Sequence, residues 1–113
     1  TPYFIDISET NYNIDVIKLE RKIDLLKKKK KRIKAIIATD FAGQPCNWKK
    51  LKLISKKHKL TLINDNCHAI GASYLNNKNY AIKYADLVTH SYHPVKHFTT
   101  GEGGAVFTNN YEI

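Results

Sequence analysis

The sequence predicts an α/β fold built on a mainly parallel sheet. Twice along the chain, an amphipathic helical pattern is followed by a short apolar run rich in β-branched residues, at 33–39 and at 60–63. Such continuous apolar runs are typical of strands that are covered on both faces. Parallel neighbours need a crossover connection, which is usually helical and right-handed. Polar residues follow both runs, which places candidate site residues at the carboxyl ends of the strands.

The first helical unit follows a predicted strand at 3–7 and a turn-rich stretch at 8–13. Asp15 is a suitable N-cap for a helix. The apolar residues after it recur at helical spacing: Val16, Leu19, Ile23 and Leu26. The basic block at 27–32 is expected to end this helix, because cations are favourable near a helix C-terminus.

The second unit begins after a loop at 41–45, in which Gly and Pro interrupt regular structure. Asn47 is expected to cap its helix, with a buried stripe formed by Trp48, Leu51 and Ile54. The strand at 60–63 then ends in a polar stretch at 64–66.

Two further strands are predicted after a mixed segment at 67–84, at residues 87–92 and 105–108. A polar loop rich in His and Gly joins them, and residues 109–113 resemble the start of another connection. No internal repeat or linker divides the 113 residues, so they are expected to belong to one domain.

Composition narrows the class of protein further. The chain has no Met and begins with Thr1, so it is expected to be a processed protein or a piece of a longer one. No apolar run reaches the roughly 18 residues of a membrane span, and no signal-peptide pattern is present. Two cysteines without a secretory context favour a reducing, cytoplasmic compartment and no disulfide.

The net charge of +9 could indicate nucleic-acid binding. However, only two of the 19 basic residues are Arg, the residue that nucleic-acid readers favour for its bidentate geometry. Much of the charge lies in the block at 27–32, where the side chains are expected to be solvated. A basic nucleic-acid-binding module therefore stands as an alternative hypothesis only.

Four polar residues fall at the predicted carboxyl ends of strands: Asp40, Asp65, Ser91 and Lys96. Asp65 is expected to point into the crevice there, although it could instead cap a helix beginning near Cys67. Lys96 has apolar neighbours that could desolvate its amine and favour the nucleophilic form.

Two other patterns carry less weight. The glycines at 101–104 lack the ending of a phosphate-binding loop and are better explained as a tight turn with positive φ. The histidines at 90, 93 and 97, together with the pair at 67–68, could suggest zinc. Pro94 interrupts any helix there and adjacent ligands would diverge, so no metal site is predicted.

Three longer motifs are more specific: FAGQPC at 41–46, INDNCHAIGA at 63–72 and HSYHPVKHFTTGEGGA at 90–105. In this order and spacing, they resemble the DegT/DnrJ/StrS sugar-nucleotide aminotransferases. These enzymes depend on pyridoxal 5'-phosphate (PLP) and belong to the aspartate aminotransferase superfamily. The resemblance runs from Pro2 to Asn110. It implies the central part of the large domain of a fold-type I enzyme, an α/β/α sandwich.

The resemblance also implies roles for individual residues. Lys96 would bind the cofactor covalently and later move the substrate proton. Asp65 would pair with the pyridine nitrogen, keep it charged and so make the ring an electron sink. Ser91 would bond the cofactor phosphate, and His68 would lie near the ring and its phenolic oxygen. The sequence departs from the family at Asn64, commonly Glu, and at 66, commonly a small residue, which could alter packing beside the ring.

Within the family, the motif at 93–104 is most similar to the transaminases of pseudaminic acid synthesis. That implies amino transfer from glutamate to C4 of a UDP-4-keto-6-deoxy-N-acetylhexosamine, in a cytoplasmic homodimer that binds neither nucleic acid nor membrane. Family members are longer, so residues 1–113 would be a partial PLP-binding large domain without its N-terminal segment and C-terminal small domain. A non-catalytic truncated copy is the remaining alternative.

Overall fold

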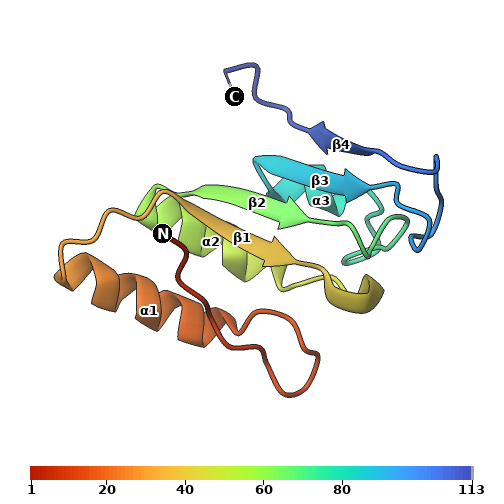
Figure 1. Cartoon of the computed structure of the whole chain (residues 1–113). Coiled ribbons are helices and arrows are strands. Elements are labelled where there is room, and N and C mark those ends of the chain that lie inside the picture. Colours follow the sequence, from red (N-terminus) through yellow and green to blue (C-terminus); the bar gives the residue numbers. More distant parts are fainter. Residues whose placement is uncertain (113) are drawn as a thin grey trace.

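A four-stranded sheet organises the molecule in a computed structural model that describes residues 1–112. The strands are β1 (Ala35–Thr39), β2 (Thr61–Asp65), β3 (Leu87–Ser91) and β4 (Gly104–Phe107), in the spatial order β1-β2-β3-β4. The first three are parallel, and β4 runs antiparallel to β3 at one edge. Figure 1 shows the three parallel strands pointing toward the same end of the molecule. The predicted α/β class with a mainly parallel sheet is confirmed.

Three helices accompany the sheet: α1 (Val16–Lys28), α2 (Trp48–His58) and the short α3 (Tyr80–Tyr84). Both predicted caps are confirmed. The Asp15 carboxylate accepts from the N–H groups of Ile17 and Lys18, and the Asn47 side chain accepts from Lys50 N–H. A single 3-10 turn, η1 (Phe41–Gly43), follows β1.

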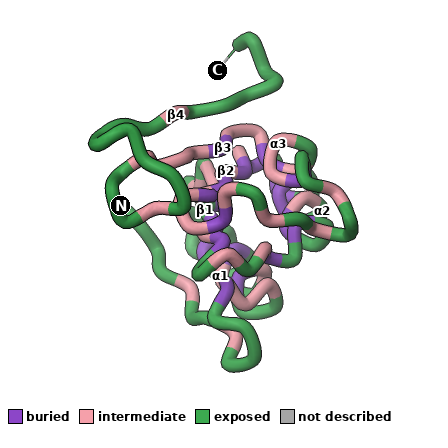
Figure 2. The backbone as a smooth tube through the Cα atoms, turned by 90° about the vertical axis from the view of Figure 1, so that its right-hand side faces the viewer, coloured by how far each residue is buried: buried purple, intermediate pink, exposed green. Residues whose placement is uncertain are grey.

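The core lies on one face of the sheet, which we call the helix face. Alternate strand residues point into it: Ile36, Ala38, Leu62, Asn64 and Val88. They pack against the buried stripes of α1 and α2 and against Tyr80 of α3. Figure 2 shows α2 and α3 on the same side of the strands, with the buried segments between them.

The opposite face, which we call the open face, is not covered by any described helix. Ile37 of β1 is 64% exposed and Val106 of β4 is 65% exposed, although both are apolar. The expectation that the strands are covered on both faces is therefore wrong for residues 1–112. Because side chains alternate along a strand, the same register that buries Ile36 and Ala38 leaves Ile37 outside.

The sequence predicts the remaining boundaries with small shifts and one error, and it misses α3, which lies in the mixed segment at 67–84. The last two strands begin and end within one residue of the predicted ranges. Residues 3–7 do not form the predicted strand, because Ile7 pairs only with Ile14 in an isolated antiparallel bridge. A short alternating segment has no ladder partner there, so its β-propensity is not sufficient.

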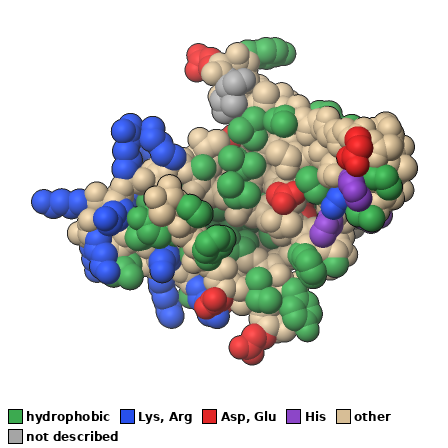
Figure 3. Space-filling view, viewed as in Figure 1, with side chains coloured by type: hydrophobic (Ala, Val, Ile, Leu, Met, Phe, Trp, Pro, Cys, Tyr) green, Lys and Arg blue, Asp and Glu red, His purple; other side chains and the backbone are tan. Residues whose placement is uncertain are grey.

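Basic side chains gather at the end of the molecule where α1 finishes, whereas histidines lie toward the carboxyl ends of the strands (Figure 3). No helix within residues 1–112 is long and apolar enough to cross a bilayer. The two cysteines, Cys46 and Cys67, are not disulfide-bonded.

Candidate functional site

The candidate site lies on the open face, at the carboxyl ends of the parallel strands. Strand register places Thr39, Asp65 and Thr89 side by side across β1, β2 and β3. Ser91 follows two residues later on β3 and therefore shares their face. The structure thus brings a carboxylate and three hydroxyl groups to one edge of the sheet, at the position where ligands bind in open parallel sheets.

Asp65 is held by two neighbours. Its Oδ2 accepts a hydrogen bond from Thr39 Oγ1 at 3.3 Å, and its Oδ1 accepts one from Cys67 N–H at 3.2 Å. The residues after Asp65 form a turn and not a helix, so the alternative that Asp65 caps a helix near Cys67 is wrong. The carboxylate is partly buried and keeps acceptor capacity for a further donor.

His68 lies beside the 3-10 turn that follows β1. Its ring is 5.9 Å from the ring of Phe41. At Gly43, where φ is +83°, an added Cβ would lie 3.6 Å from the His68 carbonyl oxygen. The FAGQPC motif at 41–46 and the motif at 63–72 therefore meet at His68, which the sequence did not indicate from spacing alone.

Lys96 is carried by a loop folded back on the end of β3. The Tyr92 carbonyl accepts from Thr99 Oγ1 at 2.7 Å and from Thr100 N–H at 3.2 Å, which closes the loop. Lys96 N–H donates to the His93 carbonyl at 2.9 Å. Lys96 itself is half-buried, while its apolar neighbours Val95 and Phe98 are 78% and 48% exposed, so these two side chains do not enclose the amine. The Phe98 ring packs against the ring of Tyr92, with centroids 4.8 Å apart, whereas Val95 points to solvent.

The predicted turn at 101–104 is confirmed. Gly101 has φ of +85° and Gly103 has φ of +143°, both in the region that favours glycine. Gly103 also accepts at its carbonyl from Tyr92 N–H at 2.9 Å, so the turn returns the chain into β4.

The Cys67 thiol is influenced by the charges of both Asp65 and Lys96. Burial is the largest influence on its thiol and raises the pKa; the Asp65 carboxylate raises it further, while Thr89 and the positive charge of Lys96 lower it. The thiol therefore feels both the carboxylate and the ammonium. Asp65 and Lys96 thus both influence the same thiol, although they are 31 positions apart in sequence.

Asp40 is not part of this open-face cluster. Its side chain is fully buried on the helix face, where it accepts hydrogen bonds from Cys46 N–H, Trp48 Nε1, Asn64 Nδ2, Asn66 Nδ2 and Tyr80 OH. The expectation that Asp40 lines the crevice is therefore wrong. Asp40 follows Thr39 in the chain and so points to the opposite face from Thr39 and Asp65.

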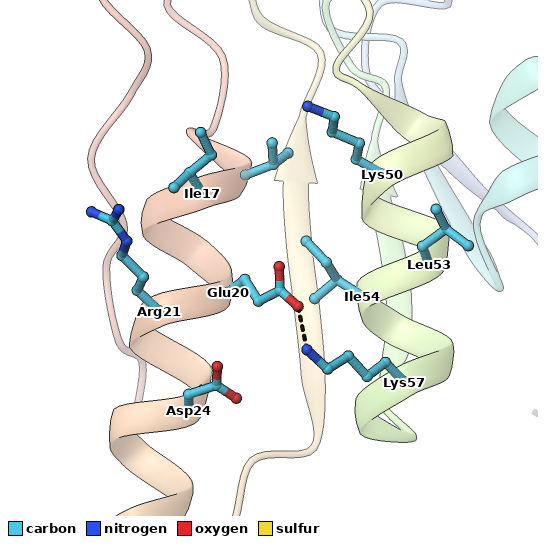
Figure 4. Close-up of a pocket in the computed structure, with 9 residues that line it drawn as sticks. Ile17, Glu20, Arg21, Asp24, Lys50, Leu53, Ile54 and Lys57 are labelled. Atoms are coloured by element: carbon cyan, nitrogen blue, oxygen red, sulfur yellow. Dashed lines mark hydrogen bonds and ion pairs between the residues drawn. The ribbon is translucent and has the colours of Figure 1, made fainter.

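Two hollows lie near these elements. The groove of about 530 Å³ between α1 and α2 (Figure 4) contains none of the candidate residues, and the Glu20–Lys57 ion pair of 2.6 Å crosses it. A larger hollow of about 800 Å³ lies between the N-terminal segment and β1, and its wall includes Thr39 and Phe41. It therefore reaches the edge of the candidate site.

The functional groups at this site fit PLP. Asp65 offers a carboxylate for a protonated ring nitrogen, Lys96 a primary amine for an aldehyde, and Ser91 a hydroxyl for a phosphate. The Ser91 hydroxyl accepts one bond, from His93 N–H at 3.4 Å, and donates to no other described group. In the part of the chain described, no three His, Cys, Asp or Glu side chains are grouped so as to hold a metal ion.

Comparison with known proteins points to the same family as the three sequence motifs. Over residues 1–113 the sequence matches the DegT/DnrJ/EryC1/StrS aminotransferase family. A UDP-4-amino-4,6-dideoxy-N-acetyl-beta-L-altrosamine transaminase from Campylobacter jejuni is 44% identical over 110 residues, which cover 97% of this chain and 28% of the relative.

Solved structures agree with the fold. Helicobacter pylori PseC, an aminotransferase involved in the biosynthesis of pseudoaminic acid, matches with a TM-score of 0.85 and 36% identity over 99% of this chain and 28% of that chain. An Escherichia coli GDP-4-keto-6-deoxy-D-mannose-3-dehydratase, solved with bound hydrated PLP, matches with a TM-score of 0.79 and 28% identity over 96% of this chain and 26% of that chain. The chain thus spans less than a third of the length of these relatives.

Proposed function

Because this chain belongs to the DegT/DnrJ/EryC1/StrS aminotransferase family, we propose that it forms part of the PLP-binding large domain of a sugar-nucleotide aminotransferase. The observation that carries the proposal is the convergence of Asp65, Ser91 and the Lys96 loop at the carboxyl ends of neighbouring parallel strands. These side chains offer the three kinds of group that PLP requires.

Each residue has a distinct task. PLP, when bound, supplies an electron sink for the carbon next to the reacting nitrogen. Asp65 would accept a hydrogen bond from the ring nitrogen and so hold a proton there, and the hydrogen bonds from Thr39 Oγ1 and Cys67 N–H fix the direction of its carboxylate. The Ser91 hydroxyl would donate to the phosphate, and His68 would lie near the ring. The Lys96 amine would hold PLP through its aldehyde carbon, with release of water. Once displaced by the amino donor, it would move the proton between the substrate carbon and the cofactor carbon.

The substrate assignment follows the relatives. The Campylobacter jejuni relative is a UDP-4-amino-4,6-dideoxy-N-acetyl-beta-L-altrosamine transaminase, which supports C4 of a UDP-4-keto-6-deoxy-N-acetylhexosamine as the acceptor position. We propose glutamate as the amino donor. The product would serve cell-surface polysaccharide or nonulosonic acid synthesis. We further propose a cytoplasmic homodimer, in which additional polypeptide covers the open face and completes the site.

Covalent binding of PLP is the first test. The protein expressed from its complete gene is incubated with PLP, reduced with borohydride and digested, and the modified peptide is identified by mass spectrometry. We expect the adduct on Lys96, and its loss in Lys96→Ala. Lys78→Ala is the matched control, because Lys78 is an exposed loop lysine outside the three sequence motifs and should leave the adduct intact. An adduct that persists in Lys96→Ala would contradict the proposal.

The substrate is tested separately. Wild-type protein is incubated with glutamate and the UDP-4-keto sugar, and the position of the new amine is read by NMR. Formation of 2-oxoglutarate without amination at C4 would reject the proposed position while leaving the aminotransferase assignment in place. A protein that binds PLP but consumes no glutamate with any keto sugar would contradict that assignment.

A further inference from the structure

We propose that Asp40 is a positioning residue of the cofactor site, which orients Asp65 from the opposite face of the sheet through Asn64 and Asn66. The proposal rests on PLP binding at Asp65, as set out above. It explains why a carboxylate lies fully buried on the helix face, at the point where β1 ends, without contributing to the open-face cluster.

The Asp40 carboxylate joins two parts of the molecule. Its Oδ1 accepts from Cys46 N–H at 2.7 Å and from Trp48 Nε1 at 3.0 Å, both at the beginning of α2. Its Oδ2 accepts from Asn64 Nδ2 at 3.2 Å and Asn66 Nδ2 at 3.0 Å, on either side of Asp65. Asp40 therefore ties the end of β2 to the start of α2.

This carboxylate is satisfied by hydrogen bonds and not by a cation. Tyr80 OH adds a fifth donor at 2.7 Å, and no ion pair within residues 1–112 involves Asp40. Burying a charge costs free energy unless hydrogen-bond donors replace its water shell. The five donors fill that role for Asp40, and in such a network each hydrogen bond strengthens the others. Burial raises the pKa of Tyr80, and the Asp40 carboxylate adds to that rise, which keeps the phenol as a donor.

The alternation of side chains carries this constraint to Asp65. Asn64 and Asn66 both point to the helix face and are almost fully buried, so the side chain between them must point to the open face. The backbone contributes as well, because Asp40 N–H donates to the Asp65 carbonyl at 3.1 Å. Asp65 is thus fixed by its neighbours before any ligand arrives.

The useful group of Asn64 is its side-chain N–H donor, and not its carbonyl oxygen. Its Oδ1 is buried and has no hydrogen-bond partner among the described residues. A buried unpaired carbonyl costs free energy, of the order of 1–3 kcal/mol. The contact from Nδ2 to Asp40 accounts for an amide at this position, and Asn66 pairs with the same oxygen. The two departures from the family pattern, at 64 and 66, are therefore partners of one carboxylate.

The test uses the protein expressed from its complete gene and compares wild type with Asp40→Asn. This change keeps the shape but turns Oδ2 or Oδ1 into a donor that faces other donors. We expect the dissociation constant for PLP to rise roughly tenfold, because a small misplacement of an orienting group weakens its contact strongly. The circular dichroism of the cofactor's visible band should change as well, because that band reports the orientation of the bound ring.

Two further variants separate positioning from general stability. In Asp40→Asn/Asn64→Asp the carboxylate and the amide exchange places, which restores the hydrogen bond between positions 40 and 64, and we expect partial recovery of the band. Trp48→Phe removes the hydrogen bond to Asp40 Oδ1 and leaves the hydrogen bonds to Asp40 Oδ2 in place. It should lower the melting temperature yet leave the dissociation constant for PLP and the band within twofold of wild type.

The outcomes are distinguishable. If Asp40→Asn is folded and its dissociation constant and band equal those of wild type, the positioning role is wrong. If Asp40→Asn does not fold, the double variant decides: a folded double variant that recovers neither the dissociation constant for PLP nor the visible band overturns the proposal. If wild type itself binds no PLP in a Lys96-dependent way, the proposed function fails and not the role of Asp40.

Discussion

Two aspartates at the ends of neighbouring strands behave differently in this molecule. Asp65 is the last residue of β2 and pairs in register with Thr39, whereas Asp40 stands one position beyond Thr39. A shift of one residue along a strand moves a side chain to the other face. Asp65 therefore faces the candidate cofactor site, and Asp40 lies among five donors in the core.

His58 provides a prediction at the residue scale. Its side chain is 6% exposed at the end of α2, its Nε2 has no hydrogen-bond partner among the described residues, and Asp24 Oδ1 lies 3.8 Å away. Burial lowers the pKa of His58, the charge of Lys27 adds to this effect, and Asp24 partly opposes it. The folded protein therefore binds this proton less readily than the unfolded chain does.

The stability that follows is pH-dependent. It is fully present above the ordinary imidazole pKa of about 6.5 and decreases as the pH falls through that value toward the lowered folded-state pKa, because the unfolded state takes up the proton first. We expect the melting temperature to fall between pH 7.5 and pH 5 by less in His58→Leu than in wild type. Equal falls in the two proteins would show that His58 does not contribute.

At the scale of elements, the helices follow local rules and the strands depend on their partners. Asp15 and Asn47 accept hydrogen bonds from the first turns of α1 and α2, so both helix starts could be read from single residues. The segment at 3–7 has the alternation of a strand but only one bridge, from Ile7 to Ile14. A strand needs a neighbour along its length, and sequence alternation does not provide one.

Gly104, at the junction of β3 and β4, provides a prediction at the scale of elements. A Cβ there would lie 2.8 Å from the His90 carbonyl oxygen, which is a backbone atom and cannot turn away. In Gly104→Ala the edge strand must move, which we expect to lower the free energy of unfolding by about 1–3 kcal/mol.

Urea denaturation measures this loss. Val106→Ala is the matched control, because Val106 lies in the same strand but is 65% exposed, and its effect should stay within about 0.5 kcal/mol. The Lys96 loop enters β4 through this glycine, so Gly104→Ala should also weaken PLP binding in the protein expressed from its complete gene. A stability equal to that of wild type would mean that β4 pairs less closely with β3 than the structure indicates.

For the whole molecule, the uneven burial of the sheet is the dominant feature. One face carries the core, while the open face presents Ile37, Val106 and the partly buried Ile63 and Leu87 to solvent. Exposed apolar surface of this kind usually marks a contact surface. This supports the proposal that further polypeptide covers the open face.

Dye binding tests that proposal. We expect residues 1–113 alone to enhance the fluorescence of a hydrophobic dye, and the protein expressed from its complete gene to do so much less. In the isolated chain, Ile37→Lys should reduce the signal, whereas Leu53→Lys, an equal change of charge at an exposed residue in the groove between α1 and α2, should reduce it less. Equal reductions would place the dye somewhere other than the open face.

The sequence by itself determined the α/β class, the two helices with their caps, the parallel strands to within a few residues, and the motifs that hold Asp65, Ser91 and Lys96. These features follow from local periodicity, capping chemistry and motif spacing. Only the tertiary structure decided which side chains share a face. The pairing of Thr39 with Asp65 and of Asp65 with Thr89 fixes that choice, and such pairing depends on contacts between segments more than 20 residues apart. For this reason Asp65 lies at the candidate cofactor site and Asp40 behind it.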